Sequence, residues 1–401
     1  MSATRIYYTF SALIGMGLGA TVTVYVPFLL SIGLTLGQVA LVNALFWAVI
    51  IVSELPTGML ADGRSRAYSL KAGAVFHAIG GLSYLLASGI WGALFSEGLI
   101  AIGMAFLSGA QQAWIADALE REGRAGQLRH VFATETIIKA ALFIIGGLGG
   151  SLLALISYRL IWVPVIVTSL AAVVFGAIKM DGQGEPLERI GEWEAFAKSW
   201  QHLRGSRALK WVVGALILFG AVVSFNHFWT PYFQLKVGTL GLSWVWAIIY
   251  LTCLPAGLLV RRLPVKTSHE AHHIVLALLL TGLGLLLIPL TGGLLLSIGA
   301  VMIHEFGRGL FQPLTDAFVH HRVSSSYRAT FGSLQSLFGR VGFAVVPLVV
   351  WITIRDAPNT PGTIGTVWIV CGSFLLVGSV FFFLWRIRET PPSLDEAPKD
   401  D

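Results

Sequence analysis

Long apolar windows, separated by short breaks rich in glycine, proline or charge, recur along the whole chain. About 20 apolar residues in an α-helix cross the hydrocarbon core of a bilayer, because each residue adds about 1.5 Å. The breaks carry turn signals, as at 33–37, 291–293 and 357–362. The windows predict twelve membrane-spanning helices, at 6–32, 38–61, 69–90, 92–117, 130–157, 159–179, 209–234, 242–262, 271–290, 294–318, 329–353 and 364–386.

The composition changes this picture little. Of the 401 residues, 55% are hydrophobic and 12% are charged, whereas soluble domains average about 25% charged residues. This excludes a disordered chain and argues against a soluble enzyme. No nucleophile–base or metal motif supports a membrane enzyme either, so we expect a protein that is not an enzyme and needs no cofactor. Cys253 and Cys371 lie in apolar windows, where we expect buried thiols.

The basic residues fall on one side of the predicted membrane. With twelve spans, 21 of the 27 lysines and arginines lie in the loops of one side, 3 lie in the loops of the other, and 3 lie within spans. Because cytoplasmic loops carry the excess of basic residues, we expect both termini to lie in the cytoplasm. We expect the protein to lie in the inner or plasma membrane of the cell. The clusters are short and flank helix ends, so we expect no nucleic-acid partner.

The two halves of the chain resemble each other. Under a shift of 199 residues, 41–60 and 240–259 share eight identities in twenty positions, and Asp117 aligns with Asp316. About two identities are expected by chance. A constant offset over two regions predicts a duplicated six-helix unit, a design that secondary transporters use. The predicted divisions are an N-terminal bundle over 1–180, a cytoplasmic linker over 181–208, a C-terminal bundle over 209–388 and a cytoplasmic tail over 389–401.

The linker has its own pattern. Its apolar residues recur every three or four positions, at Leu187, Ile190, Trp193, Phe196, Trp200 and Leu203. This spacing predicts an amphipathic helix on the inner membrane surface. A solvated linker is the alternative.

The loop after the second predicted helix contains Gly58-Met59-Leu60-Ala61-Asp62-Gly63-Arg64-Ser65-Arg66. It resembles the signature loop of the major facilitator superfamily: a glycine, three residues, an aspartate, then a glycine and basic residues. The preceding Glu54-Leu55-Pro56-Thr57 resembles a variant common among bacterial members. Ser65 departs from the pattern, since it stands in the place of the second glycine. The resemblance implies an all-α integral membrane protein with two six-helix bundles, which alternate around a substrate site near the bilayer midplane.

The resemblance also implies contacts that form in one of the two alternating-access states, where they lock the protein, and break in the other state. Asp62 would lie near the positive N-terminus of the eleventh helix, against which Gly58 would pack closely. Asp117 would pair with an arginine of the signature loop, and Asp316 with an arginine of Arg261-Arg262. The alternative is that these are solvated loop charges. The predicted gating residues are Gly58, Asp62, Arg64, Arg66, Asp117, Asp316 and Arg340.

The tenth predicted helix carries His304-Glu305-Phe306-Gly307-Arg308 near the midplane. Charges inside a membrane are costly, and they are paired or functional. Glu305 and Arg308 share a helix face, as do His304 and Arg308. We favour a cluster that binds substrate or exchanges a proton. The alternative is that Arg308 only neutralises Glu305.

Further ionisable residues lie within the spans. Glu54 and Arg340 would lie at similar depth and would pair if their helices are neighbours, as the resemblance implies. The pair is either structural or has a coupling role, so Glu54 is a further candidate for the substrate or proton site. Glu135 and Lys139 are four residues apart on one face, and we interpret them as a mainly structural pair.

Five more residues are candidates for the substrate or proton site. They are Glu97, Gln111, Gln112, Asn226 and His227. For Glu97 the alternative is a solvated carboxylate at the outer mouth, and for His227 it is a hydrogen-bonded helix contact.

Together these features predict a monomeric secondary active transporter that couples export of a small amphiphilic or drug-like compound to protons. The glycine-rich stretch 146–150 resembles one found in helix five of antiporters of the superfamily, although it lacks the proline; close packing of small residues is the alternative. Proton-coupled uptake of a nutrient, such as a sugar or organic acid, is the second prediction. A non-transporting membrane sensor or scaffold is the third.

Overall fold

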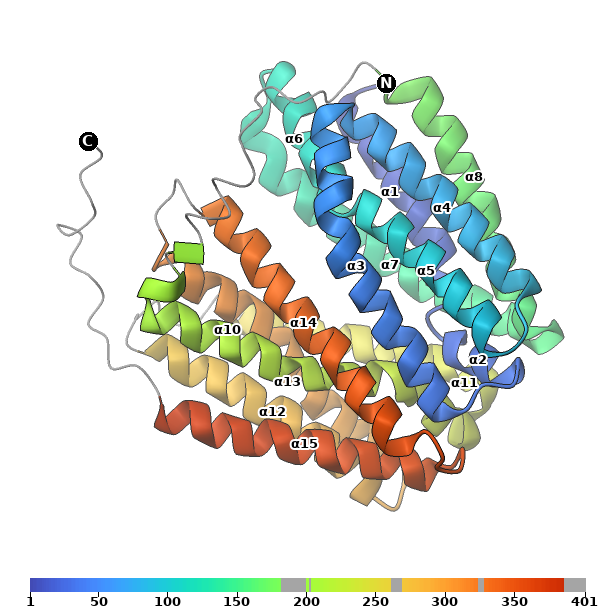
Figure 1. The fold of residues 1–401 in the computed structure, drawn as a ribbon, viewed down its shortest axis with the longest axis vertical. Coiled ribbons are helices and arrows are strands. Elements are labelled where there is room, and N and C mark those ends of the chain that lie inside the picture. Colours follow the sequence, from blue (N-terminus) through green and yellow to red (C-terminus); the bar gives the residue numbers. More distant parts are fainter. Residues whose placement is uncertain (182–199, 202, 261–268, 324–327, 386–401) are drawn as a thin grey trace. The chain divides into compact units, whose positions relative to one another are not determined.

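A computed structural model describes residues 1–181, 200–201, 203–260, 269–323 and 328–385 of the chain. All regular structure in these residues is helical (Figure 1). The α-helices are α1 (Ala3–Gly19), α2 (Tyr25–Ser31), α3 (Leu36–Gly63), α4 (Arg66–Leu86), α5 (Gly89–Leu107), α6 (Ala110–Arg121), α7 (Leu128–Ile156), α8 (Trp162–Lys179), α10 (Arg207–Phe219), α11 (Val223–Val260), α12 (Glu270–Leu290), α13 (Leu294–His320), α14 (Arg328–Ile354) and α15 (Pro361–Leu384). Short 3₁₀ turns lie at Ala125–Gln127, Tyr158–Ile161 and Gly220–Val222.

The predicted all-helical membrane fold is confirmed. In the described part of the chain, nine helical stretches are long and apolar enough to cross a membrane. The stretch Arg207–Val260 covers two predicted spans, and Gly238, with φ of 68°, interrupts its helical backbone. The predicted span 92–117 is likewise broken at Gly109, with φ of 74°, between α5 and α6. The count of twelve spans stays a prediction.

Polar caps explain where several helices begin. Thr35 and Gln38 form a capping box at the start of α3, in which each side chain bonds the other residue's backbone N–H. Ser65 accepts from the backbone N–H of Tyr68 and caps α4. Ser65 therefore has a local role in the position where the signature pattern has glycine, because a serine hydroxyl satisfies a backbone donor that is otherwise unpaired.

The described residues separate into two compact units. The first unit takes its residues from Met1–Arg189, His227–Ala247 and Pro347–Asn359, and the second from Ile190–Asn226, Ile248–Val346 and Thr360–Asp401. The element order recurs near the offset of the sequence repeat: α7 begins at Leu128 and α14 at Arg328, 200 residues later. Most of the predicted linker and the whole predicted tail lie outside the described residues. Of the linker's apolar positions, Trp200 stacks on Phe338 in the second unit, with ring centroids 6.1 Å apart.

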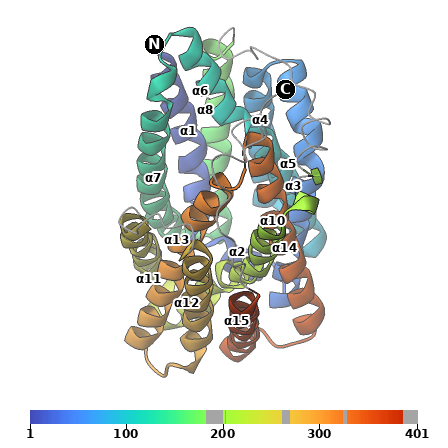
Figure 2. The same ribbon diagram turned by 90° about the vertical axis from the view of Figure 1, so that its left-hand side faces the viewer.

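In the first unit, α1 packs between α7 and α8, and α4 packs between α5 and α8 (Figures 1 and 2). The contact between α1 and α7 depends on glycines. A Cβ on Gly146 would lie 2.7 Å from the carbonyl carbon of Gly19, and one on Gly150 would lie 1.8 Å from the carbonyl oxygen of Ala20. Small residues four apart let two backbones approach closely. The glycine stretch is therefore explained by packing on α1.

The segment 227–247 of α11 also joins the first unit by contacts to α7. The indole Nε1 of Trp246 donates to the carbonyl of Phe143 at 3.2 Å, and Ser243 Oγ donates to Ser151 Oγ at 3.0 Å. Such interhelical hydrogen bonds satisfy polar groups that have no water partner in hydrocarbon.

In the second unit, α12 packs between α13 and α15. Glycines again set the distance, since a Cβ on Gly284 would lie 2.3 Å from the backbone nitrogen of His304 on α13. On the outside, large apolar side chains are exposed, among them Leu295 at 86%. Exposed apolar surface on this scale marks an interaction surface, and on membrane-length helices it is the surface that contacts lipid.

We expect Gly150→Ala to lower the thermal unfolding temperature of the purified protein, because the new methyl group would overlap the Ala20 carbonyl. Overpacking costs about 1–3 kcal/mol. The matched control is Gly149→Ala, where no atom lies within 4 Å of the new Cβ. Equal unfolding temperatures for the two variants, measured in the same detergent, would contradict a close α1–α7 contact at Gly150.

Candidate functional site

A polar cluster surrounds Glu305 on α13 in the second unit. Its carboxylate is 1% exposed and accepts from Arg308 Nη1 at 3.3 Å. The same Nη1 donates to Asn226 Oδ1 at 2.7 Å. Cys253 Sγ on α11 lies 3.8 Å from Glu305 Oε2. The sequence suggested the contact of Glu305 with Arg308 and named Asn226 only as a separate candidate on another helix. The structure brings Asn226 to Arg308 and adds Cys253, which the sequence placed only as a buried thiol.

His304 lies next to this cluster but forms its hydrogen bond with α12. Its Nδ1 lies 2.9 Å from the carbonyl oxygen of Thr281 on α12, and its ring lies 4.8 Å from that of Phe225. Its Nε2 is 3.9 Å from Glu305 Oε1, too far for a hydrogen bond. His304 and Arg308 therefore both lie near Glu305 Oε1, and only Arg308 is within hydrogen-bond distance of it.

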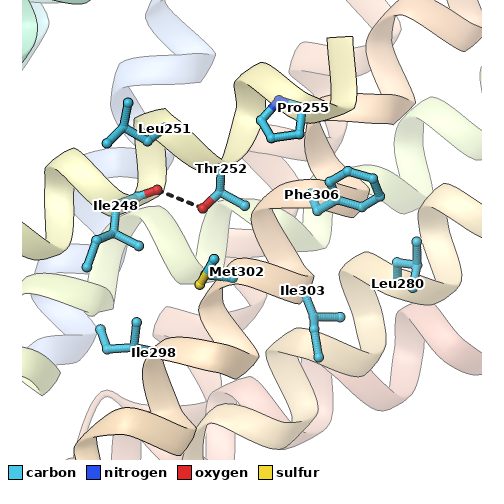
Figure 3. A pocket seen from close by; sticks show the side chains of 9 residues that line it. All are labelled: Ile248, Leu251, Thr252, Pro255, Leu280, Ile298, Met302, Ile303 and Phe306. Carbon is cyan, nitrogen blue, oxygen red and sulfur yellow. Dashed lines mark hydrogen bonds between the residues drawn. The ribbon is translucent and has the colours of Figure 1, made fainter. Parts of the chain in front are cut away.

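An apolar groove of about 600 Å³ lies in the second unit and is lined by side chains of α11, α12 and α13 (Figure 3). Its single hydroxyl, on Thr252, donates to the carbonyl of Ile248 at 2.7 Å, so the lining offers water no free donor. Thr252 directly precedes Cys253, which touches Glu305. The lining residues are Ile248, Leu251, Thr252, Pro255, Leu280, Ile298, Met302, Ile303 and Phe306.

A second acid–base cluster lies in the first unit, around Glu135 on α7. Glu135 accepts from Tyr7 at 2.5 Å, from Ser11 at 3.2 Å, from Gln111 at 3.0 Å and from Lys139 at 2.6 Å. Tyr7 and Ser11 come from α1 and Gln111 from α6. The sequence indicated the Glu135–Lys139 pair from its spacing of four, but the three further partners depend on helix packing. Gln112, the neighbour of Gln111, is exposed.

Glu97 on α5 is buried, with 5% of its surface exposed. The hydroxyl of Tyr84 donates to Glu97 Oε2, and the hydroxyls of Tyr84 and Tyr25 lie 3.1 Å apart. Trp162 stacks on Tyr84 with ring centroids 4.1 Å apart. Within the described part of the chain, Glu97 has no ion pair. The alternative of a solvated carboxylate at the outer mouth is therefore wrong, since aromatic residues enclose it.

The predicted pairing of Asp117 is resolved in favour of one arginine. Arg66, at the start of α4, places Nη1 2.7 Å from Asp117 Oδ2 near the end of α6, and both side chains are largely buried. Arg64 instead lies over the ring of Tyr68, 4.8 Å from its centroid. Gly58 and Asp62 lie in the last turns of α3, and the Asp62 side chain lies outside the described residues.

In the second unit, Asp316 accepts from Gln312 at 2.8 Å and from Gln335 at 2.9 Å. Its predicted partners Arg261-Arg262 lie outside the described residues. Sequence reasoning missed another network at the start of α12, where Glu270 binds His321 at 2.5 Å and Arg322 at 2.6 Å.

The remaining candidates are placed as follows. Ser108 Oγ donates to Glu54 Oε1 at 3.5 Å. The pairing of Glu54 with Arg340 stays a prediction. His227 is buried in the first unit, and its ring lies edge-on to that of Phe228 with centroids 6.3 Å apart.

Comparison with known proteins gives one family. The profile described as Major Facilitator Superfamily matches residues 8–347. No curated protein sequence matches the chain.

Among solved structures, the chain is similar to the nucleoside transporter NupG (14% identity, 97% of this chain and 100% of that one, TM-score 0.82). It is also similar to an auto-inhibited peptide transporter of the POT family (13%, 97% and 98%, TM-score 0.75). A third is a bacterial homologue of the human lysosomal transporter Spinster in an inward-facing, unoccupied conformation (14%, 95% and 96%, TM-score 0.71). At these identities the likeness shows the fold.

The Arg66–Asp117 pair can be tested by exchanging its charges. We expect Arg66→Asp and Asp117→Arg each to lower stability, because each leaves like charges facing each other, and the double variant to recover much of the loss. Contacting residues couple by about 0.5–3 kcal/mol. A double-mutant cycle on the thermal unfolding of the purified protein measures this coupling. Additive losses would contradict a direct pair.

Proposed function

The chain belongs to the major facilitator superfamily and is a multi-pass membrane transporter of small molecules, and from this premise we propose that it exports an amphiphilic compound in exchange for protons. The export proceeds by alternating access, without a cofactor, in a monomer. The cell's inner or plasma membrane is the proposed location, with both termini in the cytoplasm because the basic residues gather in the loops of that side.

The observation that carries this proposal is the carboxylate of Glu305. It is buried within a membrane-length helix and has Arg308 as its basic partner. An acid in this setting is stable when it is paired with a base or when it holds a proton. A proton on Glu305 and its ion pair with Arg308 are therefore alternatives. A ligand that binds at this cluster changes which of the two is present, and this dependence supplies a coupling between ligand and proton.

The apolar groove supports the amphiphilic character of the substrate. It adjoins the contact of Cys253 with Glu305, so one unit offers apolar surface and a charged cluster at neighbouring positions. Ligand sites typically combine an apolar lining with a few polar groups that orient the ligand.

Proton-coupled uptake of a nutrient is the second candidate. The observation that favours it is the polar cluster of Tyr7, Ser11, Gln111, Glu135 and Lys139 in the first unit, whose hydroxyl and amide groups suit a polar sugar or organic acid. Flux measured under inward and outward proton gradients separates uptake from export.

We expect Glu305→Gln to abolish proton movement that a substrate triggers, because an amide cannot exchange a proton. The protein is reconstituted into liposomes with an imposed proton gradient, and the pH of the lumen is recorded while lipophilic cations, sugars and organic acids are added. The matched control is Glu120→Gln, the same change at an exposed carboxylate on α6. Unchanged proton movement in Glu305→Gln would move the coupling role to Glu54 or Glu97. No response of the wild type to any compound would contradict coupled transport and favour a sensor or scaffold.

We expect Asp62→Asn to collapse transport while expression persists, because the signature aspartate would lose its charge at the proposed gate. The matched control is Asp356→Asn, the same change at an exposed aspartate paired with Arg355. Flux in liposomes, normalised to protein content, measures the effect. Equal flux in the two variants would contradict a gating role for Asp62.

A further inference from the structure

Two acid–base pairs in the membrane-length helices share one arrangement. On α7, Glu135 pairs with Lys139 four residues later, and on α13, Glu305 pairs with Arg308 three residues later. In both pairs the acid is buried and the base is accessible. The side chains of Glu135 and Glu305 are 8% and 1% exposed, whereas those of Lys139 and Arg308 are 43% and 33% exposed.

The acids are already engaged by the protein. Glu135 accepts from three residues besides Lys139, and Glu305 contacts Cys253 as well as Arg308. A cationic ligand would have to displace these donors to reach either carboxylate. Removing a donor from a buried carboxylate costs free energy, because the acid is left unpaired in a medium that solvates charge poorly.

The bases retain unused donors. Within the described part of the chain, both hydrogen bonds of Arg308 use Nη1, to Asn226 and to Glu305. A guanidinium has five N–H donors in a fixed fork, which matches a carboxylate or a phosphate. Lys139 has three donors, and its one described partner is Glu135.

Neither base faces lipid. On α7 the exposed apolar residues include Leu148, which lies about 180° around the helix from Lys139 at about 100° per residue. On α13 Leu295 lies about 140° from Arg308 by the same measure. Half-exposed cations on the side away from lipid are reachable by a polar ligand, and a charge on the lipid side would be costly.

We propose that the transported compound carries an anionic group, such as a carboxylate, sulfonate or phosphate, and that this group binds Lys139 at a site within the first unit and Arg308 at a site within the second. The buried acids Glu135 and Glu305 hold the bases in place and neutralise them when no ligand is bound. This inference rests on the proposed transport function and names the class of its substrate.

The test is equilibrium binding to the full-length protein in lipid nanodiscs, with empty nanodiscs as the blank. The probes are octanoate, octyl phosphate and octanesulfonate, each compared with octylamine, which has the same chain and the opposite charge. We expect at least one anion to bind more tightly than octylamine. Lys139→Gln and Arg308→Gln should each weaken binding at the site in its own unit at least about tenfold, as the loss of a charge-assisted hydrogen bond predicts.

Three controls separate recognition from folding and from net charge. Lys139→Arg and Arg308→Lys keep the positive charge and should retain most of the affinity. Arg355→Gln removes one exposed positive charge outside both clusters and should leave binding unchanged. Tighter binding of octylamine, no binding of any anion, or equal anion affinity in all variants would overturn the proposal; a loss in one Gln variant alone would overturn it for the other base.

Binding needs no gradient, so this result is independent of coupling. If an anion binds but its transport moves no protons, the anion site stands and the proton-coupled function fails.

Discussion

The cost of placing a charge in hydrocarbon governs this structure. Three acids within membrane-length helices are enclosed by donors: Glu135 by a lysine, two hydroxyls and an amide, Glu305 by an arginine, and Glu97 by a tyrosine. An unpaired charge at such depth costs several kcal/mol. These residues are therefore retained against a stability cost, which is the physical ground for assigning them a function.

Close helix contacts make this compensation possible. The donors of Glu135 come from three helices, and α1 reaches α7 because Gly146 and Gly150 carry no side chain. In the second unit, Gly284 lets α12 approach His304 closely enough that the imidazole binds the Thr281 carbonyl. Interiors are packed densely, so one additional methyl group at such a contact has to move a backbone. The glycines thus position the charged groups indirectly.

The proposed transport mechanism rests on two ion pairs, Glu135–Lys139 and Glu305–Arg308, in which the acid is buried and the base is accessible. An ion pair whose acid is buried and whose base is accessible presents a positive group without a net charge in the membrane. Such a pair can exchange its internal partner for an external anion, so anion binding and the charge state of the acid depend on each other. One arrangement therefore provides ligand recognition and coupling, and the apolar groove in the second unit accounts for an attached apolar tail.

The sequence alone determined the membrane class, the family and the local pairs. Apolar windows reveal spans, and spacings of three or four residues reveal Glu135–Lys139 and Glu305–Arg308, because both signals are local in the chain. Only the tertiary structure decided that Asp117 pairs with Arg66, that Tyr7 and Gln111 bind Glu135, that aromatic residues enclose Glu97, and that His304 turns to α12. Which helices become neighbours, and which side of each helix faces lipid, is set by packing between residues far apart in the chain.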